Sequence, residues 1–96
     1  MSRFATLFNR DRMNMANRAA VASTAVNALD RIQQQPKENQ VLGLACAFLL
    51  LCASLKTPAQ DVFTAAKNLM YDPIHASRMD HRFAAIQQYL DEDVLR

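Results

Sequence analysis

Two pairs of side chains in this sequence are of the types that bind zinc. Cys46 and Cys52 are six residues apart, and so are His75 and His81. Six positions correspond to about 240° of rotation in a continuous helix, so neither pair can face a single metal ion. The two pairs would also have to meet across the connections between them. We therefore predict no metal site and no cofactor, and we expect two core thiols and two surface imidazoles.

The only dense cluster of titratable side chains comprises Asp72, His75, Asp80 and His81. A hydrolytic site would need several such groups to converge on one pocket from different helices, and the rest of the chain offers few partners for them. Helix capping accounts for both aspartates without catalysis. The single glycine excludes the glycine-based phosphate loops, and there is no Ser, His and Asp arrangement. The sequence therefore predicts a protein that is not an enzyme.

The N-terminal segment combines arginines with apolar side chains that have no evident place in a core. Four arginines stand among the first twenty residues against Asp11 as the only acid. Apolar and guanidinium groups together are typical of interface hot spots. We therefore predict a partner-binding surface made of Phe4, Leu7, Phe8, Arg10, Arg12 and Arg18. Residues 1–10 would form either a short amphipathic helix or an arm that becomes ordered on a partner.

The same segment supports a second hypothesis, since arginines can hold phosphates while phenylalanines stack on bases. The net charge is only +2, from eleven basic and nine acidic side chains. A dedicated nucleic-acid-binding protein normally has a larger basic excess and a recognisable motif. A protein partner is therefore the leading hypothesis, and nucleic acid is the alternative.

The composition predicts an all-α protein. Ninety-six residues suffice for one domain with one hydrophobic core, which we expect to span residues 1–96. Glycine occurs once and proline three times, while the residues that enter helices at least cost are abundant. No signal-peptide pattern precedes the two cysteines, so we expect a reducing, cytoplasmic location.

Helical periodicity indicates a bundle of four main helices. The first is predicted from Asp11 to Gln34, where the inward positions recur at steps of three and four. These positions are Met15, Ala19, Ala22, Val26, Leu29 and Ile32. Pro36 ends this helix, and the second is expected from Lys37 to Leu55.

The third and fourth helices are marked by capping signals. Thr57 to Gln60 has the pattern of a capping box with proline at the first helical position, and opens the third helix. Its expected inward residues are Val62, Phe63, Ala66, Leu69 and Met70. The fourth helix starts either at Asp72-Pro73 or at a second capping box from Ser77 to Asp80. Its inward face is expected to carry Met79, Phe83, Ile86, Leu90 and Val94.

The segment from Val41 to Leu55 is apolar except for Ser54. As a helix it covers about 22 Å, whereas a bilayer core requires about 30 Å. Its flanks lack the Trp and Tyr that anchor membrane spans. We therefore predict a buried central helix wrapped by the three amphipathic ones. A membrane-active protein is one alternative, and burial of part of this surface between the subunits of an oligomer is another.

The stretch AQDVFTAAKNLMYDP, from Ala59 to Pro73, follows this hydrophobic helix in a chain whose start carries phenylalanine and arginine. In these features the sequence resembles small uncharacterised all-helical proteins of tailed bacteriophages, over Asn39 to Asp72. The resemblance implies a minor virion component or a small protein that binds a host factor. The prediction is therefore a non-enzymatic protein–protein interaction module that self-associates.

Overall fold

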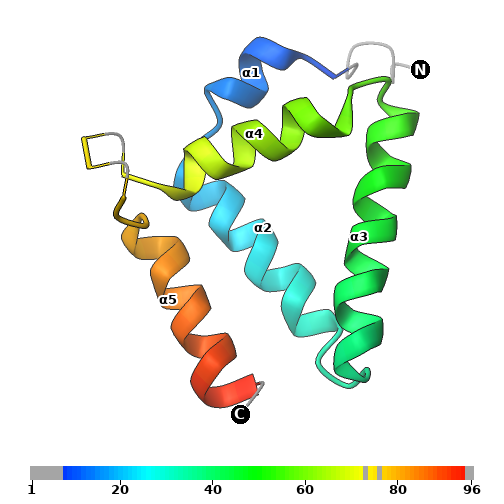
Figure 1. Cartoon of the computed structure of the whole chain (residues 1–96), viewed down its shortest axis with the longest axis vertical. Helices are drawn as coiled ribbons and strands as arrows, with labels where there is room; N and C mark the ends of the chain where they lie inside the picture. Colours follow the sequence, from blue (N-terminus) through cyan, green and yellow to red (C-terminus); the bar gives the residue numbers. More distant parts are fainter. Residues whose placement is uncertain (1–7, 73, 76, 95–96) are drawn as a thin grey trace.

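The computed structural model describes residues 8–72, 74–75 and 77–94. Its elements are α1 (Arg10–Asn14), α2 (Arg18–Arg31), α3 (Lys37–Ser54), α4 (Ala59–Met70), α5 (His81–Tyr89) and a π-helical turn, η2 (Leu90–Val94). The predicted all-α class is confirmed. In Figure 1, α2, α3 and α4 form the sides of a triangle, α5 lies beside α2, and α1 lies along α4.

The long helix predicted from Asp11 to Gln34 is divided into α1 and α2. The break falls at Met15 to Asn17, where the side chain of Asn17 accepts a hydrogen bond from the backbone N–H of Ala20 at 3.0 Å. Asparagine is a strong N-cap, so it begins a new helix here instead of continuing the old one. Met15, predicted to point inward, is 82% exposed as a result.

Helix α3 ends within one residue of the predicted boundary, but the prediction that it is buried is wrong. Of its side chains Cys52 is buried and Gln40 and Phe48 are half-buried, and five are at least 56% exposed, namely Val41, Leu42, Leu49, Leu50 and Leu51. The amphipathic helices do not wrap it, because α2 packs against α5 and α1 against α4. Helix α4 contacts α3 but turns away from it at 117°.

The sharp turn after α3 comes from the way the helix ends. Lys56 has a φ of 57°, and its backbone N–H donates to the carbonyl oxygen of Ala53 at 3.2 Å. The N–H of Thr57 donates to the carbonyl oxygen of Cys52 at 3.0 Å. This pair of bonds is a Schellman motif, which closes the helix and redirects the chain.

The predicted capping box at the start of α4 does not form. Pro58 occupies the N-cap position, and the buried hydroxyl of Thr57 has no hydrogen-bond partner among the described residues. Gln60 instead places its side-chain amide 3.4 Å from the hydroxyl of Thr64. The Schellman motif already uses the backbone of Thr57, so this residue belongs to the end of α3.

The connection between α4 and α5 is a tight reversal, and α5 starts at neither of the predicted places. An isolated antiparallel bridge joins Tyr71 to Met79, and the N–H of Asp80 donates to the carbonyl oxygen of Met70 at 2.7 Å. The carboxylate of Asp80 then caps α5 by accepting from the N–H of Arg82 at 2.9 Å. The reversal thus holds the end of α4 against the start of α5.

The buried core is small. Among the described residues Ala22, Cys52, Thr57 and Phe83 are buried, and no large side chain is fully enclosed. The radius of gyration is 14.6 Å, whereas a compact chain of this length has about 12.5 Å. The chain is therefore more open than a closed bundle of the same size.

Candidate functional site

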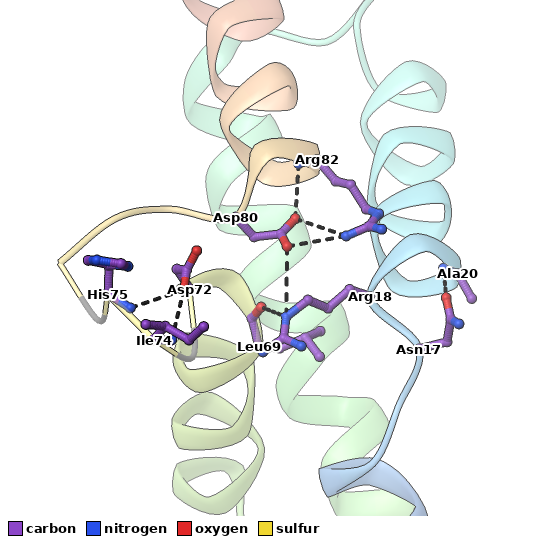
Figure 2. A network of polar contacts seen from close by, with 9 residues as sticks. All are labelled: Asn17, Arg18, Ala20, Leu69, Asp72, Ile74, His75, Asp80 and Arg82. Carbon is purple, nitrogen blue, oxygen red and sulfur yellow. Dashed lines mark hydrogen bonds and ion pairs between the residues drawn. The ribbon is translucent and has the colours of Figure 1, made fainter.

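A polar network at one corner of the triangle joins three helices, and Figure 2 shows Arg18 at its centre. The Nε of Arg18 donates to the carbonyl oxygen of Leu69 at 2.7 Å and lies 3.9 Å from a carboxylate oxygen of Asp80. Leu69 lies in the last turn of α4, where carbonyl groups have no partner within the helix. Asp80 is also paired with Arg82 at 3.2 Å. The network therefore positions α2, α4 and α5 relative to one another.

The titratable cluster noted in the sequence is used for local structure. The backbone N–H groups of His75 and Ile74 donate to the carboxylate of Asp72 at 3.0 and 2.7 Å (Figure 2). These bonds, with smaller contributions from the charges of Arg78 and Arg18, hold the pKa of Asp72 below its ordinary value. The described part of the chain holds no group of three or more metal-ligating side chains.

The four candidate zinc ligands lie in different surroundings. His75 and His81 are exposed, as predicted for surface imidazoles. Cys52 is buried, as predicted for a core thiol, whereas Cys46 is exposed. The prediction for Cys46 is wrong because it assumed that the whole of α3 lies in the core.

The predicted N-terminal surface is only partly within the described residues, since Phe4 and Leu7 lie outside them. Arg18 belongs to the polar network, and Arg10 forms an ion pair with Asp61 of α4. Phe8 is half-buried and Arg12 is exposed. The proposed role of these six residues in binding a partner stays a prediction, and two of its arginines also have partners within the chain.

The feature best suited to contact another molecule is the exposed surface of α3. We define its outer stripe as Leu42, Cys46, Leu49 and Ala53, which follow one another at steps of four, three and four. Leu42 is 67% exposed and Leu49 56%, and beside them Leu50 is 69% exposed. No charged residue occurs between Val41 and Leu55. Exposed apolar surface of this extent is typical of interaction sites.

A second apolar surface is a groove of about 430 Å³ between α2, α4 and α5. Its walls include Val21, Ala25, Leu29, Val62, Leu69, Met79, Phe83, Ile86 and Leu90. On α4 and α5 most of these positions were predicted to face inward, but on α2 only Leu29 was. The prediction is wrong for Ala19 and Phe63, which are exposed, because the face of each helix that packs is set by its neighbours and not by its own periodicity alone. The groove is the seam along which these three helices meet.

The outer stripe was not predicted, although the sequence contains a signal for it. Each amphipathic helix has one apolar stripe, and the stripes of α2 and α5 are used on each other. A helix that is apolar on all sides needs neighbours on all sides. With the stripes of α2 and α5 packed against each other, too few apolar stripes remain to cover α3 on all sides, and part of α3 stays exposed.

Within the described residues, no single helix is long and apolar enough to cross a membrane. Only α3 and α4 taken together, with the 117° bend between them, reach the necessary length and composition. No protein-family model, curated protein or solved structure matches this chain.

Proposed function

We propose that this chain is a non-enzymatic protein–protein interaction module and that it contacts its partner through the exposed surface of α3. The observation that carries the proposal is the exposure of Leu42, Leu49 and Leu50 on a helix without charged residues. Burying one leucine side chain contributes about 1.5–3 kcal/mol. Contact between this surface and an apolar partner surface is therefore strongly favourable.

The setting of this activity is part of the proposal. The free thiols of Cys46 and Cys52 suit a reducing compartment such as the cytoplasm. The resemblance to small proteins of tailed bacteriophages favours a role as a minor virion component or as a binder of a host factor. Both roles act through protein contacts and need no catalytic group.

The partner-binding role predicted for the N-terminal arginines is secondary to α3 in this proposal. Arg18 donates to the carbonyl oxygen of Leu69, and Arg10 is paired with Asp61. Each arginine held in this way is less available for phosphate contacts, which supports a protein partner over nucleic acid. Phe8 and Arg12 remain candidates for an additional contact at the edge of the interface.

A photo-crosslinking amino acid placed at Leu50 tests the proposal in cells that produce the chain. Leu50 is 69% exposed on α3, so a probe there does not disturb the core. The matched control is the same probe at Gln88, which is exposed on α5. We expect a covalent adduct of discrete mass from position 50 and none from position 88, read on a denaturing gel and identified by mass spectrometry.

The result that would contradict the proposal is equal labelling from the two positions, or no adduct from either. To verify that the probe leaves the fold intact, helical content is compared with that of the unmodified chain by circular dichroism. A loss of adduct when Leu49→Glu is added would show that the contact depends on the apolar surface of α3.

A further inference from the structure

We infer that the partner of α3 is a second copy of this chain, an inference that rests on the proposed role of α3 as a contact surface. The two α3 helices pair in antiparallel directions along their outer stripes. Leu42, Cys46, Leu49 and Ala53 recur with the heptad spacing that lets two helices pack side by side. The stripe extends over about 16 Å of helix, or three turns.

The exposed area of the chain is the first argument for a second copy. The chain exposes 7544 Å², whereas a folded monomer of 10.8 kDa exposes about 5,500 Å². The difference of about 2,000 Å² exceeds the roughly 800 Å² that each partner buries in a standard interface, so the chain has enough additional surface to form one. The apolar side chains of α3 contribute to this excess.

The absence of charge on the stripe is the second argument. A two-fold dimer places one patch against its own copy, so any charged group near the axis faces a like charge. No charged residue lies between Val41 and Leu55, so two copies of the stripe meet without like-charge repulsion. A partner chosen for its charge would find nothing on this surface to recognise.

The charges in register with the stripe at the two ends of α3 favour one direction of pairing, since Lys37, five residues before Leu42, falls on another side of the helix. Glu38 lies four residues before the stripe, Lys56 lies three residues after it, and both are exposed. In an antiparallel pair, Glu38 of each copy lies near Lys56 of the other. A parallel pair would bring Glu38 beside Glu38 and Lys56 beside Lys56. Opposite charges therefore favour the antiparallel arrangement, which also aligns the helix dipoles favourably.

The first test is sedimentation velocity on the purified full-length chain without detergent, over a range of concentrations. We expect a species of twice the mass of one chain, which Leu49→Glu converts to a monomer and the matched control Gln88→Glu leaves unchanged. Circular dichroism of each variant verifies that the helices are retained. A chain that stays monomeric, or that sediments only with added detergent or lipid vesicles, would overturn the inference.

Native cysteines locate the interface. In the antiparallel pair, Cys46 of each copy lies within one turn of Cys46 of the other, while Cys52 is buried in its own chain. A short bismaleimide is therefore expected to link two native chains and to fail with Cys46→Ser. A dimer that forms in solution but is not linked through Cys46, or that persists in Leu49→Glu, would place the interface elsewhere and refute the pairing.

The antiparallel direction of the pairing is tested by exchanging the charges of Glu38 and Lys56. Glu38→Lys is expected to raise the dimer dissociation constant by about two- to five-fold at low salt, and adding Lys56→Glu is expected to restore it. If the double exchange fails to restore binding, the antiparallel arrangement is wrong.

The crosslinking and sedimentation results together separate the proposed function from the second-copy inference. An adduct from Leu50 with a different protein, together with a monomeric purified chain, would retain the proposed function and reject the second copy.

Discussion

Lys56 ends α3 in the left-handed region, with a φ of 57°, where glycine is the usual residue. A side chain with a Cβ is strained in this conformation, and glycine is not. We expect Lys56→Gly to raise the free energy of unfolding by about 0.5–1 kcal/mol, since relief of the strain outweighs the greater freedom of glycine in the unfolded chain. Urea unfolding followed by circular dichroism measures this change in the free energy of unfolding. Lys56→Ala removes the same charge but keeps the strain, so an equal gain in that variant would refute the explanation.

Arg18 is the residue on which the meeting of three helices depends. Its replacement by alanine leaves the carbonyl oxygen of Leu69 without its donor and removes a charge close to Asp80. We expect Arg18→Ala to lower the free energy of unfolding by about 1–3 kcal/mol. Arg12→Ala, an exposed change on the same segment, is the control and is expected to cost less than about 0.5 kcal/mol. Similar costs for both variants would show that the network does not support the fold.

Asp72 makes stability depend on pH in the acid range. Its pKa in the folded chain is lowered chiefly by the N–H groups of His75 and Ile74. A carboxyl group with a lowered pKa stabilises the fold above its ordinary pKa of about 3.9, and this stabilisation is lost as the pH falls through the lower, native value. We expect urea midpoints to fall below about pH 4 more steeply for the native chain than for Asp72→Asn. Asp91→Asn, an exposed change on η2, is the control and should keep the steeper profile.

At the scale of elements, α2 packs on α5, and each of these helices contributes a buried side chain to the core. Phe83 is 7% exposed and lies with Ala22 in the small core, whereas Phe63 on α4 is 53% exposed. We expect Phe83→Ala to lower the free energy of unfolding by about 3 kcal/mol. Phe63→Ala is expected to lower it by less than about 1 kcal/mol, a figure that includes the lost contact between the Phe63 ring and the ammonium group of Lys67. Thermal unfolding of both variants provides the comparison. A larger loss from Phe63→Ala would show that α4 is buried in solution.

Helices were predictable from the sequence, whereas their pairing was not. Pro36 and the change to polar residues after Leu55 marked the ends of α3 to within one residue. The division at Asn17 was missed because the apolar spacing continues through it, and the local capping bond outweighs that pattern. The stripes of α2, α4 and α5 are compatible with packing on α3 or on one another, and periodicity does not distinguish these arrangements. The outer stripe of α3 depends on that choice, so it was not identified from the sequence.

For the whole molecule, the second-copy inference predicts that stability depends on concentration. Binding that occurs only in the folded state raises the apparent stability by mass action. We therefore expect the midpoint of thermal unfolding to rise with protein concentration in the native chain, as measured by scanning calorimetry. Leu49→Glu is expected to give a midpoint that does not change with concentration. A constant midpoint in the native chain would indicate that α3 does not pair in solution.

The open triangle of α2, α3 and α4 also has a consequence for the speed of folding. Most contacts in this chain join residues that are close in sequence, and such topologies fold rapidly, within microseconds to milliseconds. Docking of two subunits is slower and depends on how often they meet. Refolding should therefore show a rapid first-order phase in which helices form, followed by a second-order phase in which the fluorescence of a dye bound to apolar surface declines as α3 is covered. During synthesis in a cell, each new chain would pass through the interval between these phases with α3 uncovered.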